Sequence, residues 1–483
     1  MMKHYAKQKK GIKVFAMLLF FSVSVYCQDI YVDQNVSGGA KDGTSWQNAF
    51  EKVTEGISAA VANNTLHIAK GTYTGAAAST AFDIDKSLTI IGGYPTGGGT
   101  SDAIANETIL DGQSARRVVI IRKGSTLKGL IIENGKEVDF DGGGLQILSS
   151  STLENCIVRN NVCEKSNDTD VLGGGIYCAF NLTLVNCQIT NNTAGSTSTD
   201  NTKMVLGGGV RVKGVLKVTN TLFSNNTANS STGSALGGGI YASKQTEFYN
   251  SLIINNKTSS NSSSDGAGLY ASGTSGSSSK AIRLRNSIMW ENTASTDGGS
   301  SFSSNEYSIN GPSVGFFTAI NSLIDGEFLD GNGNSDNIDD SLGAFDPMFT
   351  DKVNNDYTLQ STSALINSGA DSFNNTTADL AGNTRIVETI DIGPFEFQSA
   401  TASVDDDFTN SITVYPNPAS NFIKISNNFL NANYSIFSTL GQKLKIGKID
   451  GTNNINISDL SAGNYILKIR FENAIYTKKI VKQ

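Results

Sequence analysis

The chain has 483 residues, 50 of them glycine and only 2 histidine, and a formal charge of −7. Charged residues make up 17% of the chain, against about 25% in a typical soluble domain, and small polar residues take their place. This composition fits two classes of protein: a disordered chain, or a solenoid whose turns are made of small polar residues. Residues 28–410 hold 41 acids against 23 bases, which excludes nucleic acid as a partner, because phosphate binding needs a basic face, and argues more weakly against polyanionic sugars.

Residues 1–27 predict a secretory signal peptide. Five lysines without an acid form a basic start, and Val14–Tyr26 is an apolar stretch of secretory length that is too short to span a bilayer comfortably. We expect cleavage after Cys27. Lipidation of Cys27 is the less favoured alternative, because Tyr26 is large where a lipobox has small residues. No later stretch is apolar enough to cross a membrane, so the mature protein is expected to be soluble or surface-tethered.

Two short elements recur five times between residues 142 and 292. The glycine element starts at Gly142, Gly173, Gly207, Gly237 and Gly266, and the asparagine element starts at Asn155, Asn186, Asn220, Asn250 and Asn286. The offset between them is 13 residues in the first four repeats, whereas the segment after each double Asn varies in length and reads as a loop. Apolar alternation within the fixed segment indicates short strands. Each repeat is thus predicted to be a coil of about three strands, stacked at ~4.8 Å, with its turn asparagines hydrogen-bonded along the axis.

These repeats resemble the right-handed parallel β-helix superfamily, in particular polymorphic-outer-membrane-protein-like repeats. Ile30–Asp33, Asp42–Phe50 and Ile68–Tyr73 are similar to the start of such bacterial β-helices. The resemblance implies an amphipathic helix at Ala49–Val61 that covers the unpaired edge of the first coil. The expected fold class is all-β: a right-handed parallel β-helix solenoid over residues 28–398, followed by a small C-terminal β-sandwich.

Residues 300–397, approximately, resemble the choice-of-anchor Q module, which in its relatives finishes the β-helix ahead of an anchoring or sorting element. The segments that carry this resemblance are Ala344–Phe349, Asp356–Leu359, Ser363–Gly369 and Asp391–Glu396. Near its start, oxygen ligands at alternate positions suit calcium. These residues are Asp330, Asn332, Asn334 and Asp336. The cluster lacks the glutamate that closes an EF-hand loop, and a plain Asx-rich turn is the alternative.

Residues 399–410 form a predicted linker, and short alternating strands in residues 411–483 predict a small sandwich. Tyr415–Pro418, Leu460–Tyr465 and the basic end Lys478–Lys482 closely resemble the type A C-terminal sorting domain of type IX secretion. The resemblance implies that residues 411–483 bind the type IX secretion machinery and are usually removed after export. The resemblance further implies that the protein is secreted or attached to the outer surface of the outer membrane, there through lipopolysaccharide. A carbohydrate-binding sandwich is the alternative, although it lacks the exposed aromatic cluster expected for sugar stacking.

The four cysteines after the signal peptide show no zinc or redox spacing. Cys156 and Cys187 occupy the same place in consecutive repeats, so a stacked core pair and a disulfide are both open, and Cys163 and Cys178 complete the set.

No catalytic set is recognised. His67 falls in a strand predicted to be buried near the N-terminal cap, so a core or cap role is expected rather than catalysis. The basic candidates are scattered as on a solvated face. They are Arg116, Arg117, Arg122, Lys123, Lys128, Arg211, Lys213 and Lys217.

Two functions therefore remain. The first is a non-catalytic, adhesin-like surface β-helix, expected to be a monomer, that binds extracellular polysaccharide or cell surfaces. The alternative is a polysaccharide lyase or glycoside hydrolase. It requires a groove lined with carboxylates or basic residues from successive coils.

Overall fold

A computed structural model describes residues 29–75, 78–167, 169–272, 282–310, 317–327, 329, 334–398, 413–426, 432–439, 442–471 and 474–483. The predicted signal peptide and linker lie outside these ranges, as do Asp330 and Asn332 of the calcium cluster. The described residues form two compact units, one on each side of the boundary at residue 398. None of the helices in the described part has the length and apolar character needed to cross a bilayer.

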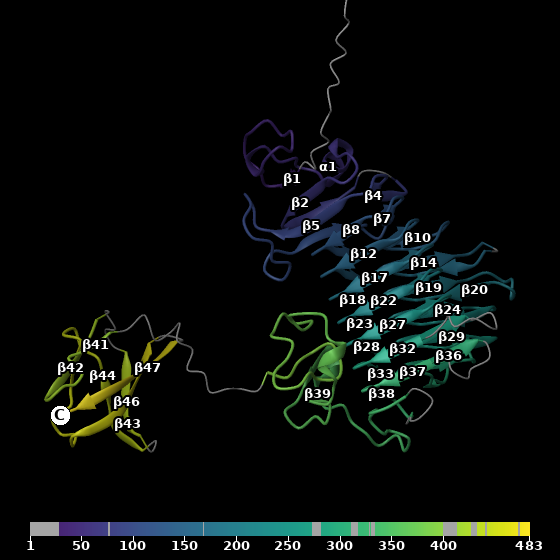
Figure 1. Cartoon of the computed structure of the whole chain (residues 1–483). Helices are drawn as coiled ribbons and strands as arrows, with labels where there is room; N and C mark the ends of the chain where they lie inside the picture. The colour runs from purple at the N-terminus through teal and green to yellow at the C-terminus, as the bar shows by residue number, and fades with distance from the viewer. Residues whose placement is uncertain are drawn as a thin grey trace, which may run out of the picture. The chain divides into compact units, whose positions relative to one another are not determined.

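The first unit is a solenoid whose strands stack, from purple to green in Figure 1, into sheets that follow its axis. Sheet A contains β1 (Asp29–Val32), β2 (Thr65–Ala69), β5 (Thr89–Tyr94), β8 (Thr126–Lys128), β12 (Ser151–Glu154), β17 (Leu182–Val185), β22 (Leu216–Thr219), β27 (Thr246–Tyr249), β32 (Ile282–Arg285) and β37 (Phe317–Ile320). Sheet B contains β3 (Gly71–Thr74), β6 (Thr108–Asp111), β9 (Ile131–Glu133), β13 (Ile157–Arg159), β18 (Gln188–Thr190), β23 (Leu222–Ser224), β28 (Leu252–Ile254), β33 (Ile288–Trp290) and β38 (Leu323–Ile324). Sheet C contains β4 (Thr80–Ile84), β7 (Arg117–Ile121), β11 (Leu145–Ile147), β16 (Ile176–Cys178), β21 (Val210–Val212), β26 (Ile240–Ala242), β31 (Leu269–Ser272) and β36 (Tyr307–Asn310). All three sheets are parallel, and the predicted fold class is confirmed.

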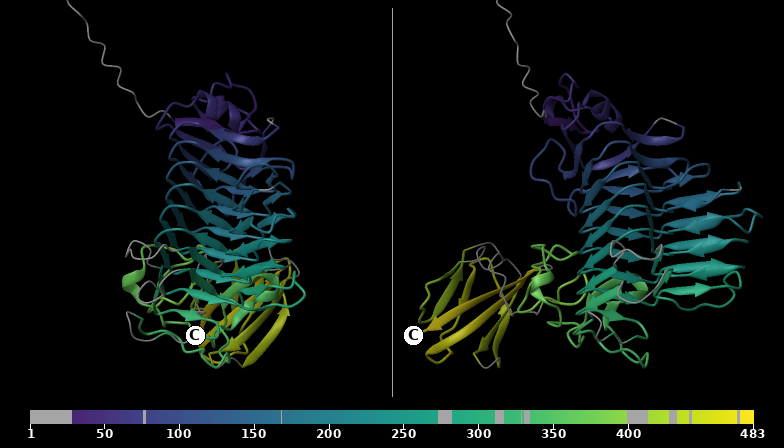
Figure 2. Two further views of the ribbon diagram at one scale, coloured as in Figure 1. Left: turned by 90° about the vertical axis from the view of Figure 1, so that its right-hand side faces the viewer. Right: turned by 45° about the vertical axis from the view of Figure 1, so that its right-hand side comes forward.

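Two further sheets extend to one side of the coils (Figure 2). Sheet D contains β10 (Lys136–Glu137), β14 (Val162–Lys165), β19 (Thr193–Ser196), β24 (Thr227–Ser230), β29 (Lys257–Ser260), β34 (Thr293–Ser295) and the antiparallel β35 (Ser303–Ser304). Sheet E contains β15 (Val171–Leu172), β20 (Met204–Leu206), β25 (Ser234–Leu236) and β30 (Ser263–Asp265). The sequence predicted a loop here, and that prediction is wrong in the central coils, which have five strands. Small apolar residues such as Ala194, Val205 and Ala228 pack in the cluster between these sheets, and the polar composition concealed them.

The N-terminal end of the solenoid is covered by a short helix. The 3₁₀ turn η1 (Trp46–Asn48) leads to α1 (Val53–Ala59), which is shorter than the predicted helix but lies within its range. Val53 and Ile57 are buried in the same core as the first strands, and Gly56 approaches Leu66 so closely that a Cβ would clash with it. The helix therefore covers the first coil, as the resemblance implied.

The last asparagine of each asparagine element belongs to a buried ladder. Its members are Asn161, Asn192, Asn226, Asn256 and Asn292, each with 0% exposure. In each of the first four members, Nδ2 donates a hydrogen bond to Oδ1 of the next member, over 2.8–3.0 Å. The last member donates through Nδ2 and its backbone N to the two side-chain oxygens of Glu306. The predicted axial hydrogen bonding of turn asparagines is thus present.

The cysteines after the signal peptide all remain as free, buried thiols in the structure. Burial raises the pKa of Cys156 and of Cys178 to about 11, so both are protonated at neutral pH. Of the two alternatives for Cys156 and Cys187, the structure contains the pair of core residues.

Beyond β38 the chain adds no further coil among the residues described. It forms β39 (Phe349–Asp351), η3 (Lys352–Asn354), β40 (Asp356–Leu359) and η4 (Asp371–Phe373), and it packs back onto the outer face of sheet B. The apolar cluster that joins the two contains Leu222, Leu252, Ile254, Ile288, Trp290, Leu323, Phe349, Tyr357, Leu359, Leu365 and Ile392. The choice-of-anchor-like segment therefore covers one side of earlier coils.

The second unit consists of two antiparallel sheets. One contains β41 (Val414–Tyr415), β42 (Phe422–Ile425) and β45 (Asn454–Asn456), and the other contains β43 (Asn433–Ser438), β44 (Lys443–Lys448), β46 (Gly463–Phe471) and β47 (Ala474–Lys482). Ile423, Ile436, Leu467 and Ile480 belong to its buried core. This arrangement matches the predicted small β-sandwich.

Candidate functional site

The outer face of sheet A carries a column of threonines. Parallel pairing brings five of them into register on consecutive strands. They are Thr65, Thr89, Thr126, Thr152 and Thr183, and we call them the threonine column. Their neighbours in each strand, such as Leu153 and Leu184, point into the core, so the threonines face outward and are half-buried. In the part of the chain that the structure describes, their hydroxyls make no hydrogen bond to another protein group, so they are free to bind a ligand.

The link between sheets C and A has a constant length. In six successive coils, four residues separate the last residue of the sheet C strand from the sheet A residue that stands in line with the threonine column. The first of these coils contains β4 and the last contains β26. These links supply small polar residues such as Ser87, Ser150 and Asn181. A constant length stacks equivalent turn positions above one another, so the edge of sheet A is regular along the axis.

A groove of about 850 Å³ follows this edge, and we call it the C/A groove. It crosses six strands, or about 24 Å at ~4.8 Å per coil. Its lining residues are Asn63, Ser87, Leu88, Thr89, Gly124, Ser125, Thr126, Ser150, Ser151, Thr152, Asn181, Leu182, Thr183, Val215, Lys217, Gln245 and Glu247. Hydroxyl and amide groups dominate this surface, and such groups exchange hydrogen bonds readily with the hydroxyls of a sugar.

Charged groups continue the threonine column toward the later coils. Thr183 pairs in register with Lys217, Lys217 with Glu247, and Glu247 with Arg283. Arg283 Nη1 donates to Glu247 Oε1 over 2.6 Å, and Gln245 Nε2 donates to the same oxygen over 2.8 Å. The Glu247 carboxylate is therefore already bound, whereas Lys217 is exposed and makes no ion pair within the described residues.

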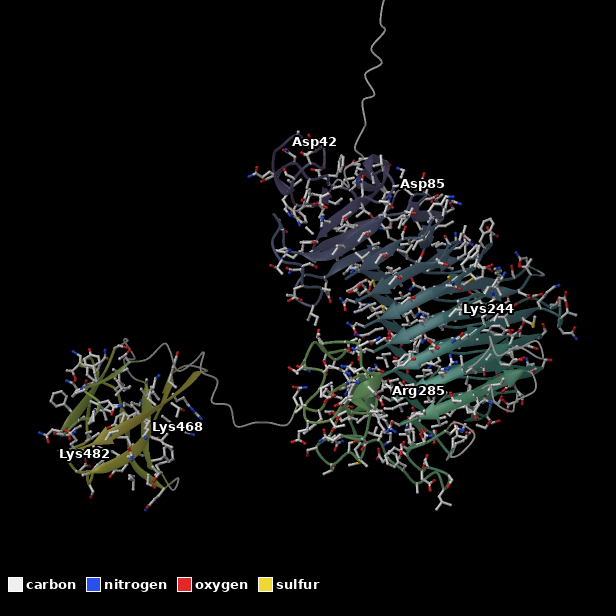
Figure 3. The ribbon with its side chains drawn as sticks, in the orientation of Figure 1. Asp42, Asp85, Lys244, Arg285, Lys468 and Lys482 are labelled. Atoms are coloured by element: carbon white, nitrogen blue, oxygen red, sulfur yellow. The ribbon has the colours of Figure 1, made fainter. Side chains whose placement is uncertain are left out.

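Exposed lysines stand beside the C/A groove in the same links. Lys123 precedes the lining residue Gly124, Lys213 lies two residues before Val215, and Lys244 precedes Gln245 (Lys244 is labelled in Figure 3). Of these, Lys213 contacts the Tyr177 ring, with Nζ 5.4 Å from its centroid. Together with Lys217 they give this edge a positive charge on an otherwise acidic body, which favours an anionic ligand.

An exposed aromatic ring also belongs to these links. Phe180 is 54% exposed and directly precedes Asn181, which lines the groove. Its backbone carbonyl accepts a hydrogen bond from Gly214 N over 3.1 Å, and a Cβ at Gly214 would clash with that carbonyl. The link is thus fixed by its neighbour while the ring stays open to solvent, a position suited to stacking on a sugar.

The basic residues singled out in the sequence divide into two groups. Lys123, Lys213 and Lys217 lie along the groove, and Arg122 lies in the same row of links but is paired with Asp83, with Nε to Oδ1 at 2.8 Å. The others serve the fold. Lys128 pairs with Glu154, and Arg117 forms a buried pair with Glu137, whereas Arg116 donates to the Gly75 carbonyl and Arg211 stacks on Tyr241 at 4.4 Å.

His67 lies in the expected strand, but its side chain is not part of the solenoid core, so of the two predicted roles the one at the N-terminal cap stays a prediction. Its ring points outward from sheet A, stacks on Tyr31 at 5.2 Å between centroids, and meets Tyr94 edge-on. His67 Nδ1 is 2.8 Å from the Tyr94 hydroxyl, and Nε2 is 3.0 Å from Asp29 Oδ1. The alternation within β2 turns Leu66 and Ile68 inward instead.

Two of the four residues of the predicted calcium cluster are described. Asn334 Oδ1 accepts a hydrogen bond from Ala319 N over 2.7 Å, and Asp336 has a left-handed backbone with φ 55°. Among the described residues, no three His, Cys, Asp or Glu side chains come together as a possible metal site. The hydrogen bond of Asn334 joins it to a residue 15 positions earlier and is no Asx turn, so both calcium and the Asx-rich turn stay predictions.

The comparisons with known proteins concern the two units separately. The comparison with curated proteins found no match. Among solved structures, the chain is similar to pectate lyase Pel9A, with 13% identity, coverage of 77% of this chain and 96% of that chain, and a TM-score of 0.37. It is also similar to pectin methylesterase PemA from Erwinia chrysanthemi, with 11% identity, coverage of 68% and 98%, and a TM-score of 0.32. Residues 413–483 match the family described as secretion system C-terminal sorting domain. The sorting domain predicted from the sequence is thereby confirmed, and it marks the chain as cargo of the type IX secretion system.

Proposed function

We propose that the solenoid is a non-catalytic, adhesin-like polysaccharide-binding protein that works outside the cell after type IX export. The observation that carries this proposal is the C/A groove. It runs along the solenoid axis, as an extended polymer would, and it is lined mainly by hydroxyl and amide groups. Its hydrogen-bonding groups repeat at the coil spacing, so a polymer can contact several equivalent positions at once.

The exposed lysines make an acidic polysaccharide the favoured ligand. Lys123, Lys213, Lys217 and Lys244 all lie in or beside the groove, and each can attract a carboxylate or sulfate group on the polymer. The overall acidity of the body argued against polyanionic sugars, but charge acts over about a Debye length of ~8–10 Å, so the local lysines dominate at the groove. The lining also argues for binding without hydrolysis. Among the described lining residues Glu247 is the one carboxylate, whereas glycosidases use two.

The test is a binding titration of the mature protein against alginate, polygalacturonate and neutral cellulose oligomers. In a variant that carries both Lys217→Glu and Lys244→Glu, we expect the Kd for the acidic polymers to rise about tenfold or more, since each exposed charge contributes up to about 1 kcal/mol. Lys136→Glu is the matched control. It reverses an exposed lysine on β10, on sheet D. No binding to any polymer would refute polysaccharide binding, and equal weakening by the control would refute a role for the groove.

A specific arrangement supports an enzyme as the second candidate. The chain from Asp29 through His67 to Tyr94 has the hydrogen-bond order of a proton relay, with His67 Nε2–H donating to Asp29 and Nδ1 accepting from the Tyr94 hydroxyl. Burial, followed by the charge of Asp29, raises the pKa of Tyr94, so the Tyr94 hydroxyl keeps its proton and can donate it to Nδ1 of His67. A lyase would release unsaturated uronates from the acidic polymers. Their absorbance should then appear with the mature protein and disappear in His67→Gln, while absence of product supports the binding function.

A further inference from the structure

The four-stranded sheet of the sorting domain has one strongly basic face. Ile436, Leu467 and Ile480 point into the core of the sandwich, so the alternate residues of these strands point away from it. The register places these alternate residues in three rows across the sheet. The rows are Lys448–Asn433–Arg470, Ile446–Ser435–Lys468–Thr477 and Lys443–Phe437–Ile466–Lys479. They bring together five cations and, among the residues described, no acid.

A pocket of about 430 Å³ lies within this basic face. It is lined by Asn433, Ser435, Phe437, Lys443, Lys468 and Arg470. Two ammonium groups flank one ring, since Lys443 Nζ is 5.7 Å and Lys468 Nζ is 5.6 Å from the centroid of Phe437 (Lys468 is labelled in Figure 3). The ring holds both side chains in place. Three cations and two neutral polar groups around one hollow are suited to an anion.

The cations of the basic face have no acidic partner close to them in the described part of this domain, unlike Lys445. Lys445 has its partner, Asp459, with Nζ to Oδ1 at 2.7 Å. The five cations of the face make no ion pair with a described residue of this unit. Like charges close together on a sheet repel each other, and an anion that binds between them relieves this repulsion. Solubility alone requires charge but does not require that it gather on one face.

The edge of the same sheet is open. Strand β44 is the end strand, with β43 as its one neighbour in the described sheet, so half of its backbone groups face outward. Two apolar side chains on it are exposed, Leu444 at 41% and Ile446 at 68%. The lysines beside them repel a second copy of this basic strand, but they attract an acidic strand.

We propose that this basic face and strand β44 bind an acidic, extended segment of the type IX export machinery. The segment adds to the sheet as a strand beside β44, its apolar side chains cover Ile446, and a carboxylate enters the pocket beside Phe437. Charge complementarity selects the partner, since residues 411–483 hold nine bases against three acids. The proposal rests on the sorting-domain match and is independent of what the solenoid binds.

The test uses the full-length chain expressed in its own secreting cells. Lys468→Glu should lower the secreted fraction at least about fivefold and leave the protein in the periplasm, whereas Lys468→Arg should be secreted normally. Lys424→Glu is the matched control. It reverses an exposed lysine on β42, in the other sheet. The periplasmic Lys468→Glu protein must show the same thermal midpoint as the parent chain, and Lys443→Glu replaces it if it does not fold.

A direct binding measurement identifies the partner chemistry. The purified full-length chain is titrated with a synthetic peptide of alternating Glu and Val, with its Lys–Val counterpart, and with vesicles that contain anionic lipid. Binding of the Glu–Val peptide that is lost in Lys468→Glu supports the proposal. Binding of the vesicles but not of the peptide would overturn it in favour of a membrane surface, and equal secretion of Lys468→Glu and Lys424→Glu would overturn it as well.

Discussion

Two polar columns follow the solenoid, and each repeats one residue type on five consecutive coils. The asparagine ladder is fully buried, and its amides bind one another and nearby backbone groups. The threonine column of sheet A is half-exposed, and its hydroxyls make no hydrogen bond to other described groups of the protein. Repetition of a residue is therefore no indication of its role. Burial and hydrogen bonding separate a column that the fold needs from a column that is free to bind.

The third repeated surface, the outer face of sheet B, supports this distinction. Leu222, Leu252, Ile288 and Leu323 are in register there, and they are apolar and covered by the segment that packs back after β38. An apolar column on the outside must be covered, because its exposure to water is costly. A hydroxyl column needs no cover, and the groove at sheet A therefore stays open.

The substitution Asn226→Ala tests the asparagine ladder and has the largest expected effect on stability. Asn226 Nδ2 donates to Asn256 Oδ1 and to Ile189 O, and its Oδ1 accepts from the backbone N and from Nδ2 of Asn192. Removing the amide leaves four buried groups with lost partners, so we expect the free energy of unfolding of the solenoid to fall by about 2–4 kcal/mol. Urea unfolding followed by circular dichroism measures this. A loss below about 1 kcal/mol would show that the ladder is not required by the fold.

The second test uses the carboxylate at the end of the ladder. Burial raises the pKa of Glu306 to about 8, well above the 4.5 of an exposed glutamate. The folded state therefore holds a proton that the unfolded state releases between these values. The contribution of Glu306 to stability is full below pH 4.5 and falls by about 1.4 kcal/mol per pH unit as the pH rises toward 8.

Glu306→Gln cannot titrate, so this part of the slope should disappear from a plot of unfolding free energy against pH. Glu164→Gln, at an exposed position of β14, is the control and should keep the parent slope. A parent-like slope in both variants would mean that Glu306 is ionised in the folded protein.

The sequence predicted the asparagine ladder but not the threonine column, for a physical reason. The asparagines recur beside a glycine element at a fixed offset, so the pattern is visible along the chain. The threonines lie 24, 37, 26 and 31 residues apart, because loops of different length intervene, and only the strand register aligns them. The sequence also missed sheets D and E, since alternation of alanine and serine is a weak hydrophobic signal.

The groove was predicted only in part. The lysines Lys123, Lys213 and Lys217 were recognised as candidates, and the fixed offset of 13 residues indicated a segment of constant length, but it did not indicate which positions of that segment face an open groove. Lys244 and Phe180 were missed for the same reason. An alignment of the chain on its own coils, with the position after each sheet C strand as the reference, would have brought Lys123, Phe180 and Lys244 into one column.

The substitution Thr152→Val, in the middle of the threonine column, tests that column and has the smallest expected effect. Valine keeps the shape and the β-propensity of threonine and removes only the hydroxyl, which binds no other described group of the protein. We expect the free energy of unfolding to change by less than about 0.5 kcal/mol, as for surface substitutions in general. Binding of the acidic polymers should weaken about threefold, because one ligand hydrogen bond of about 0.5–1 kcal/mol is lost.

A binding titration paired with urea unfolding measures both the affinity and the stability of Thr152→Val. If stability falls as far as in Asn226→Ala, the threonine column belongs to the fold like the asparagine ladder. If neither quantity changes, the hydroxyls do not touch the ligand, and the lysines alone account for binding in the groove.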